Sequence, residues 1–332
     1  MTPTPPLPIG VVGLGAVGSR VARQLIESGH SVIAHDVEST AFTSLRGVEQ
    51  CTFSETIDAF SDTSCCSIVL CTPAPQAALA TTFLDRGLDV VAVSDDADDV
   101  HELVALDQRA RERGTRLIVG AAASPGMSGL LAAELALRFD TVDEIHVAFH
   151  GTGGPSCARQ HHQALGGEAL GWHDDEWIER PGGSGRELLW FPEPVGGKDC
   201  YRAELADPIV LKRAFPEVSR ISARVSATRR DRLTARLPMM SPPHAEGGLG
   251  GLRVEVRGSR DGQRVTEVAG IAERTAVIAA SVAASVADHL SRRERDQSGV
   301  ITLGDGQLDD VSLVTAVIER DIRVFEYVGV SD

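Results

Sequence analysis

Hydrophobic positions in the first 120 residues fall into short apolar runs, separated by longer stretches with a helical repeat. A short apolar run predicts a strand buried on both faces, and apolar residues spaced three or four apart predict a helix. Such strands alternating with helices are typical of a parallel sheet with helices on both sides. The predicted strands cover residues 9–12, 31–35, 67–71, 89–94 and 116–120, with helices ending near Gly29, Leu84 and Arg113.

The pattern changes after Gly126, where strands with a repeat of two residues begin. Residues 219–228 alternate strictly, and residues 252–257 alternate before Asp261-Gly262, a pair that favours a hairpin turn. Alternation of this kind predicts an antiparallel sheet with one buried face. The remaining predicted elements are helices over residues 127–139, 271–290 and 311–319, a strand over residues 322–328 and a loop over residues 238–251.

The two patterns predict an α/β fold, in which a doubly wound parallel Rossmann sheet is joined to a second α+β domain with a mostly antiparallel sheet. We assign residues 1–125 to the first domain and residues 126–270 to the second. The long helix expected from residue 271 returns the chain to the first domain, so residues 271–332 complete it.

Composition narrows the classes of partner. The formal net charge of −15 argues against nucleic acid, whose phosphates would repel the chain. The longest apolar stretch, residues 276–287, is too short to span a bilayer, so we expect no membrane association. Six cysteines without a C-x-x-C pair in a long chain favour reduced thiols and a cytoplasmic location.

A glycine-rich loop, Gly13-Leu14-Gly15-Ala16-Val17-Gly18, lies between the first predicted strand and helix. The first glycine allows the tight turn, the second lets a pyrophosphate approach the backbone, and the third lets helix and sheet pack closely. The helix N-terminus then presents free N–H groups to the phosphates. With strand, loop, helix, strand and acid in this order, the segment predicts a dinucleotide site rather than an unrelated glycine-rich turn.

Asp36 ends the second strand about 20 residues further along, where an acidic side chain accepts the ribose hydroxyls. Its charge would repel a 2′-phosphate, and no Arg or Lys follows until Arg46. The sequence therefore favours NAD over NADP. Ligands of doubly wound sheets bind at the carboxyl ends of the strands. The residues expected there to contact the cofactor are Cys71, Thr72, Pro73 and Ser94, beside the loop residues Gly13, Gly15, Ala16, Val17 and Gly18.

These features resemble the saccharopine dehydrogenase-like oxidoreductases. Beside the glycine loop and Asp36, the similar segments are residues 120–128, 191–196 and the ending Phe325-Glu326-Tyr327-Val328-Gly329. The resemblance implies hydride transfer, frequently at a carbon that bears nitrogen in an amino-acid-derived substrate. It also implies a Rossmann domain, a smaller α+β domain for substrate, and a homodimer. Ala123-Ser124 stands where an acidic residue often precedes the proline of the family's turn.

The start of the second domain offers a place for a carboxylate. The glycine-rich loop 151–156, with Gly153 and Gly154, precedes a helix expected to begin near Cys157. A helix N-terminus supplies free N–H groups to an anion, and Arg159 adds a guanidinium that can bind a carboxylate with two hydrogen bonds. The alternative for this segment is a solvated surface loop. The substrate is therefore expected to be a small anion.

Hydride transfer also needs a proton donor or acceptor near the reacting carbon. The candidates are His150 and His161 at the start of the second domain, and Lys198, with Tyr201 as a further substrate-binding residue. Each has a structural alternative as a packed or surface side chain. No metal is expected, because the spacing of His161, His162, His173, Asp174 and Asp175 fits no zinc pattern.

Together these observations predict an NAD-dependent oxidoreductase that acts on a small, carboxylate-bearing, amino-acid-derived substrate at an amine or imine carbon. Two alternatives stay open. One is a dehydrogenase of a hydroxyl or aldehyde carbon, similar to homoserine dehydrogenase. The other is an NAD-binding sensor protein without turnover, since no residue is unmistakably catalytic.

Overall fold

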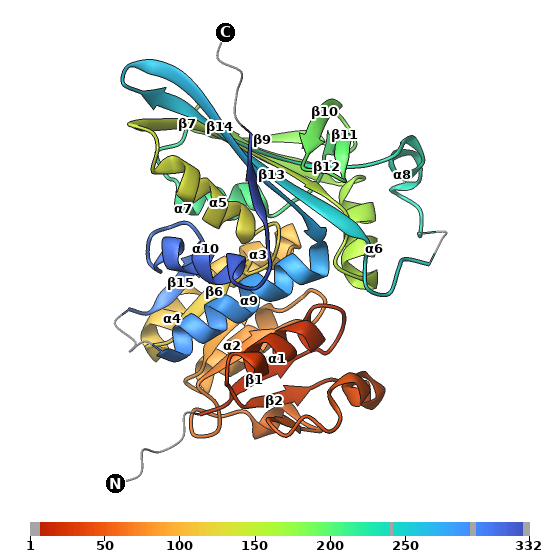
Figure 1. Cartoon of the computed structure of the whole chain (residues 1–332), viewed down its shortest axis with the longest axis vertical. Coiled ribbons are helices and arrows are strands. Elements are labelled where there is room, and N and C mark those ends of the chain that lie inside the picture. Colours follow the sequence, from red (N-terminus) through yellow and green to blue (C-terminus); the bar gives the residue numbers. More distant parts are fainter. Residues whose placement is uncertain (1–6, 240–241, 293–296, 328–332) are drawn as a thin grey trace.

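The computed structural model describes residues 7–239, 242–292 and 297–327. Two sheets dominate it, one near each end of the long axis, with helices packed between them (Figure 1). Val328 and Gly329, which belong to the similar ending of the chain, lie outside the described residues. The architecture confirms the predicted combination of a doubly wound parallel sheet and a second, mostly antiparallel sheet.

The first sheet has seven strands, all parallel, in the order β15-β6-β5-β4-β1-β2-β3. Read from β3, this is the strand order of a Rossmann fold, and the order reverses between β1 and β4. A ligand is expected in the crevice beyond the carboxyl ends of those two strands. The strands are β1 (Ile9–Val12), β2 (Val32–His35), β3 (Cys51–Phe53), β4 (Ser67–Leu70), β5 (Asp89–Ala92), β6 (Arg116–Val119) and β15 (Gly299–Thr302).

Except in the edge strand β3, almost every residue of these strands is buried, because helices cover both faces of the sheet. β15 comes from the end of the chain and adds the seventh strand beside β6. The helices of this part are α1 (Gly18–Glu27), α2 (Ala77–Asp85), α3 (Ala97–Val104), α4 (Asp107–Arg113), α9 (Thr275–Arg292) and α10 (Asp310–Ile318).

The second sheet has the order β10-β11-β12-β7-β13-β14-β16, with β8 paired to β12 and β9. Among the described residues, its strands pair antiparallel except for β12 with β7, which are parallel. Its elements are β7 (Thr141–His150), β8 (Glu168–His173), β9 (Glu176–Pro181), β10 (Glu187–Phe191), β11 (Gly196–Arg202), β12 (Arg220–Ser226), β13 (Leu249–Arg260), β14 (Gln263–Arg274) and β16 (Val324–Glu326), with helices α5 (Met127–Ala136), α6 (Pro155–Ala164), α7 (Asp207–Ala214) and α8 (Arg229–Thr234).

One face of this sheet is buried, as the alternation predicts. Ile221, Ala223 and Val225 of β12 are each less than 5 % exposed, whereas the residues between them point to the other face. Helices α5 and α7 lie on the buried side, between the second sheet and the Rossmann part (Figure 1). The opposite face carries charged and polar side chains, which include Glu144, His146, Arg220 and Arg224.

Several predicted boundaries were wrong. The predicted helix 271–290 starts only at Thr275, because residues 271–274 continue β14 and pair with β13. The long helix expected to end at Arg113 is divided into α3 and α4. The predicted loop 238–251 gives way to β13 from Leu249 onward. In each case pairing within a sheet or packing decides a boundary that the apolar pattern leaves open.

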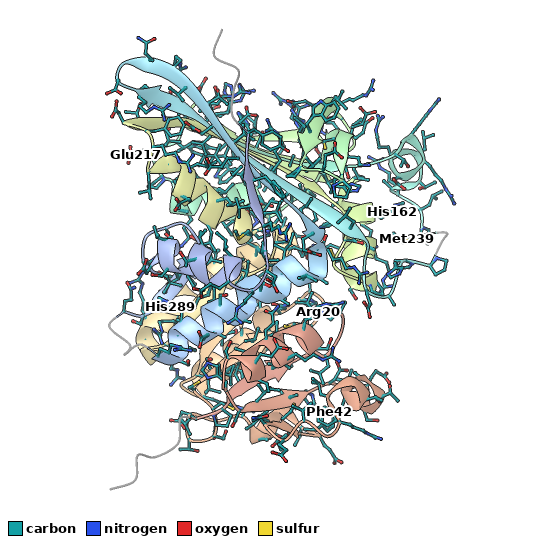
Figure 2. The ribbon with its side chains drawn as sticks, in the orientation of Figure 1. Arg20, Phe42, His162, Glu217, Met239 and His289 are labelled. Atoms are coloured by element: carbon teal, nitrogen blue, oxygen red, sulfur yellow. The ribbon has the colours of Figure 1, made fainter. Side chains whose placement is uncertain are left out.

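Helix α9 connects the two parts, since it follows β14 directly and then packs along α1. His30 Nε2 lies 2.5 Å from Asp288 Oδ1, and Gln24 Nε2 donates to Ser281 Oγ at 3.1 Å. These contacts hold α9 along α1 (Figure 2), and Thr275 and Ala279 at the start of α9 line the same cavity as the glycine loop. Among the described residues, no helix has the length and hydrophobicity needed to cross a membrane.

Candidate active site

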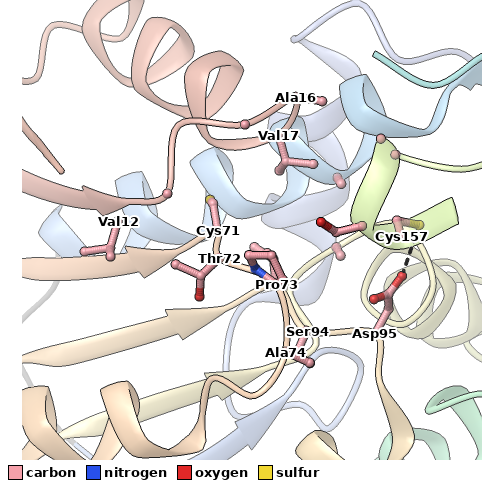
Figure 3. Close-up of a pocket in the computed structure, with 18 of the residues that line it drawn as sticks. Val12, Ala16, Val17, Cys71, Thr72, Pro73, Ala74, Ser94, Asp95 and Cys157 are labelled. Atoms are coloured by element: carbon pink, nitrogen blue, oxygen red, sulfur yellow. Dashed lines mark hydrogen bonds between the residues drawn. The ribbon is translucent and has the colours of Figure 1, made fainter. Parts of the chain in front are cut away.

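A cavity of about 660 Å³ opens where the order of the parallel strands reverses (Figure 3). One side is formed by the glycine loop and the ends of β1, β2, β4 and β5, and the other by the start of α6 and the first residues of α9. Predicted cofactor and substrate residues that line it are Gly13, Gly15, Ala16, Val17, Asp36, Cys71, Thr72, Pro73, Ser94, Gly153 and Gly154.

The three glycines of the loop face different surroundings. Gly13 has φ of +92°, and a Cβ there would lie 2.8 Å from the backbone of Cys71. At Gly18 a Cβ would overlap the carbonyl oxygen of Gly13, so this glycine permits the close approach of α1 to the loop. Gly15 has no protein atom within 4 Å of its Cβ position, and it faces the cavity. This is the arrangement that leaves room for a pyrophosphate.

Asp36 lies at the end of β2 and lines the cavity. Its Oδ2 accepts the backbone N–H of Leu14 at 2.6 Å, and its Oδ1 accepts that of Glu38 at 2.8 Å. A carboxylate oxygen has more than one lone pair, so both oxygens keep capacity for ribose hydroxyls. Among the described residues that line the cavity, none is an arginine or lysine.

The ends of β4 and β5 form the floor of the cavity. Burial raises the pKa of the Cys71 thiol to about 12, so this cysteine is a neutral packed side chain. The hydroxyls of Thr72 and Ser94 are buried and lack a hydrogen-bond partner among the described residues. Because an unpaired buried hydroxyl is unfavourable, both are suited to bind a ligand that fills the cavity.

The wall formed by the second part begins at Gly153. Helix α6 starts at Pro155 with Gly154 as its N-cap, and Ser156, Cys157 and Gln160 line the cavity from its first turns. The first N–H groups of a helix have no intrahelical acceptor, and the helix dipole favours an anion at that end. The structure thus places a helix N-terminus on the cavity, where the sequence predicts a carboxylate site.

Three titratable side chains meet beside this helix. Cys157 Sγ lies 3.4 Å from Asp95 Oδ2 and 3.8 Å from His161 Nε2, and the last two atoms are 3.2 Å apart. Asp95 follows β5, whereas Cys157 and His161 lie one turn apart on α6. Asp95 and Cys157 line the cavity (Figure 3). His161 is not among the lining residues, and its side chain is 7 % exposed.

For both His161 and Cys157, burial shifts the pKa in one direction and the contact between the two residues shifts it in the other. Burial disfavours a charge on His161, but Cys157 and Asp95 outweigh that effect and raise the pKa of His161 well above its ordinary value. Burial also raises the pKa of the Cys157 thiol, and His161 partly offsets this. The ring of His161 packs edge-on against Phe149, with centroids 5.6 Å apart.

Other predicted site residues do not line the cavity. Gly18 lies behind the loop, and Arg159 is exposed on α6, where its Nη2 donates to Ser156 Oγ at 3.3 Å. His150 ends β7, and its Nδ1 lies 2.6 Å from Ser226 Oγ. Burial, and then the charge of Lys198, lower the pKa of His150. The side chains farther along the second sheet are Lys198, opposite Leu189 on the β10 edge, and Tyr201, buried beneath Arg232.

Several cavity residues were missed by sequence reasoning. Asp95 belongs to no motif that marks it as a site residue, and the sequence indicates Cys157 only as the beginning of a helix. The spacing of four residues between Cys157 and His161 was a usable signal, because it places two side chains on one helix face. Nothing in the sequence joins this pair to Asp95, which is separated from Cys157 by 62 residues.

Comparisons with known proteins agree with this geometry. Residues 8–137 match the family model for the NAD binding domain of 6-phosphogluconate dehydrogenase. No curated protein matches the sequence significantly. Among solved structures, saccharopine dehydrogenase (L-Glu forming) from Saccharomyces cerevisiae is similar over 97 % of this chain and 100 % of its own, with a TM-score of 0.69 and 11 % identity.

Two further structures share the fold at 15 % identity. DAP dehydrogenase from C. glutamicum, in complex with DAP, has a TM-score of 0.55 and covers 96 % of this chain and 100 % of its own. An engineered D-amino acid dehydrogenase, bound to NADP+, has a TM-score of 0.54 with the same coverage. The chain therefore has an NAD(P)-binding oxidoreductase fold, and the predicted resemblance to saccharopine dehydrogenase is confirmed at the level of the fold.

Proposed function

We propose that this protein is an NAD-dependent oxidoreductase that transfers a hydride to or from a small, carboxylate-bearing, amino-acid-derived substrate. The observation that carries the proposal is the single cavity of about 660 Å³ shared by the dinucleotide loop and the N-terminus of α6. A nicotinamide cofactor bound at the loop would extend along the strand ends toward that helix. The reacting carbon of the substrate then lies between the cofactor and α6.

The preference for NAD over NADP rests on charge. Asp36 follows β2 and places its carboxylate where the ribose of the cofactor is expected. Within the described residues, no cation lines the cavity. A 2′-phosphate there would meet a carboxylate without compensation, whereas two ribose hydroxyls would donate to it.

The choice of substrate rests on the α6 end of the cavity. Helix N–H groups at Ser156 and Cys157, together with the buried hydroxyls of Thr72 and Ser94, suit a small polar anion. Arg159 lies one turn along α6, and its contact with Ser156 brings its charge near this end. Reaction at a C–N carbon is supported by the shared fold with the saccharopine, DAP and D-amino acid dehydrogenases.

Of the three candidates for proton transfer, His161 has the best position. It contacts two residues of the cavity wall, whereas His150 and Lys198 contact none of its named lining residues. We therefore place the reacting group of the substrate next to Asp95 and Cys157. We also propose that residues 1–125 and the C-terminal segment from residue 271 form the cofactor domain, except that residues 271–274 of β14 and strand β16 pair within the second sheet. We further propose that the protein is a cytoplasmic homodimer and that its six free cysteines stay reduced.

The proposal is tested by following NADH absorbance with a panel of 2-keto acids, each with and without ammonia or an amino acid as amine donor. We expect oxidation of NADH that requires both the keto acid and the amine. Turnover of keto acids or aldehydes without an amine would contradict reaction at a C–N carbon and favour a dehydrogenase of a hydroxyl or aldehyde carbon. NADH binding without turnover of any substrate would instead favour the sensor alternative.

A further inference from the structure

We propose that Asp95, Cys157 and His161 bind a zinc ion at the substrate end of the cavity. Each residue offers one ligand atom, and the three atoms lie within 4.8 Å of one another. Thiolate, imidazole and carboxylate together are donors typical of zinc. The sequence alone predicts no metal, because the histidines and acids of residues 161–175 do not have the spacing of a zinc site. It does not show the long-range contact that brings Asp95 to α6.

The distances between the three atoms fit a shared ion. Zinc bonds of about 2.0–2.3 Å at the tetrahedral angle place neighbouring ligand atoms about 3.3–3.6 Å apart. The observed separations are 3.2, 3.4 and 3.8 Å. A direct charge-assisted hydrogen bond between imidazole and carboxylate would be shorter, about 2.7–2.9 Å. The ligand atoms are therefore spaced as around a common centre.

The orientation of His161 gives a second argument. In a Cys-His-Asp proton relay, the imidazole uses one nitrogen for the thiol and the other for the carboxylate. Here the same nitrogen, Nε2, faces both Cys157 and Asp95, while Nδ1 is buried without a partner among the described residues. Three groups that converge on one point form a ligand set. With the ion bound, His161 would serve as a ligand through Nε2, and the proton transfer proposed for it above would pass to the group bound at the open position of the ion.

The site would be open on one side. Asp95 and Cys157 line the cavity (Figure 3), whereas His161 is buried and not among the lining residues, so a fourth position of the ion would face the cavity and the proposed substrate. Zinc sites with three protein ligands and one open position bind water or a substrate heteroatom. If the substrate binds where the proposed function places it, the ion would hold a carbonyl, hydroxyl or amine group of that substrate. Metal binding itself does not depend on that function.

The affinity should be moderate. Histidines that bind metals usually donate their second ring N–H to an acceptor, and loss of that partner weakens binding by about 10- to 100-fold. His161 Nδ1 has no such acceptor among the described residues. We therefore expect an ion that chelators remove without unfolding the chain.

The experiment measures metal binding directly. Chelator-treated full-length protein is titrated with Zn²⁺ against a chromophoric competitor, and with Co²⁺ to detect the thiolate-to-cobalt absorption band. We expect one ion per chain and a thiolate band. The substitutions C157S, H161Q and D95N each remove a ligand and should weaken Zn²⁺ binding by more than about 100-fold. Loss of a hydrogen-bond partner of a ligand, by comparison, weakens binding by about 10- to 100-fold.

Two matched controls keep the test specific. His162 is adjacent to His161 on α6, but its Nε2 binds the carbonyl oxygens of Thr234 and Leu237, so H162Q should retain the ion. C51S, on the distant strand β3, should retain it too. Circular dichroism and NADH titration show whether each variant is folded.

Absence of stoichiometric Zn²⁺ binding to protein that still binds NADH would overturn the zinc site and leave the oxidoreductase proposal intact. Binding that survives C157S and H161Q would also overturn it.

Discussion

Asp36 at the end of β2 is tied to the glycine loop by a 2.6 Å hydrogen bond from the Leu14 N–H to its Oδ2. The same carboxylate therefore shapes the loop that would hold the pyrophosphate, and in the proposed complex it would also face the adenosine ribose. We expect this one side chain to couple the conformation of the phosphate loop to the choice between NAD and NADP.

Substitution of Asp36 should change both functions. We expect D36A to weaken NADH binding by about 10- to 100-fold, because hydrogen bonds to a charged group contribute about 1.5–3 kcal/mol. NADPH binding should change less, since repulsion of the 2′-phosphate is removed. Both dissociation constants can be measured by fluorescence titration, with D36N as the control that keeps the shape of the side chain. Tighter binding of NADPH than NADH by the unmodified protein would contradict the assignment.

Gly15 and Gly18 provide a test that separates cofactor contact from folding. An alanine Cβ at Gly15 has no protein neighbour within 4 Å, so G15A should unfold at the same temperature as the unmodified protein but bind NADH more weakly. At Gly18 the Cβ would overlap the Gly13 carbonyl oxygen, so G18A should lower the melting temperature as well. Thermal melts with and without NADH distinguish the two. Unchanged NADH affinity in folded G15A would mean that the pyrophosphate binds elsewhere.

The sequence predicts the Rossmann half well because its signals are local. Each buried strand is a short apolar run, and the glycine loop, α1 and Asp36 occur in a fixed order within 30 residues. The family resemblance also anticipates the second part, and the alternation in β12 and β13 predicts its exposed and buried faces.

The cluster at the substrate end could not be predicted in the same way. Asp95 and Cys157 meet only because β5 and α6 come from different parts of the chain. The strands between Glu168 and Arg202 carry exposed Trp177 and Trp190 and no clean alternation, so their pairing is also a long-range property. Lys198 and Tyr201 were chosen for their chemistry, and sheet register then placed them away from the cavity lining.

Glu255 should make stability depend on pH. Its carboxylate accepts hydrogen bonds from Arg253 at 2.7 Å and Arg257 at 2.6 Å, and lies opposite His146 on β7. Burial alone would raise its pKa, but the two arginines outweigh burial and hold it below the ordinary value of 4.5. Because the unfolded chain binds the proton more readily, this contribution is present above pH 4.5 and is lost as the pH falls through the folded pKa.

We therefore expect E255Q to lower the free energy of unfolding by about 1–3 kcal/mol at neutral pH. The difference from the unmodified protein should shrink as the pH falls below 4.5. Urea denaturation across that pH range measures both quantities, and the exposed Glu176, as E176Q, serves as the control. A difference that is constant with pH would show that packing, and not the charge, is responsible.

The charged face of the second sheet is the expected dimer interface. A two-fold interface uses the same surface of both copies, so a substitution acts twice. Arg220 is exposed on β12 and lies beside Glu144. R220E would give this face two neighbouring acidic groups in each copy, and their repulsion across the interface should shift the dimer toward monomer at micromolar concentration. Light scattering measures the change, with R46E on the cofactor part as control. A monomeric unmodified protein would contradict the proposed dimer.

The structure limits how Arg159 can bind the substrate carboxylate, which is its predicted role. It is exposed and lies outside the cavity lining, yet its guanidinium reaches Ser156 Oγ at 3.3 Å, and Ser156 lines the cavity. A small rotation of the side chain on binding would bring it to a substrate carboxylate at the N-terminus of α6. If it makes that contact in the transition state, R159A should lower kcat/KM by about 10- to 100-fold, or about 1.5–3 kcal/mol.

The conservative variant separates charge from geometry. R159K keeps the charge but cannot form the two parallel hydrogen bonds of a guanidinium, so it should recover only part of the loss. The dissociation constant of NADH should be the same in all three proteins, because Arg159 lies apart from the glycine loop. R186A, on the second sheet and away from α6, is the control for a general loss of positive charge. Unaltered kcat/KM in R159A would place the carboxylate on the helix N–H groups alone, and the substrate site would then rest on residues 153–157.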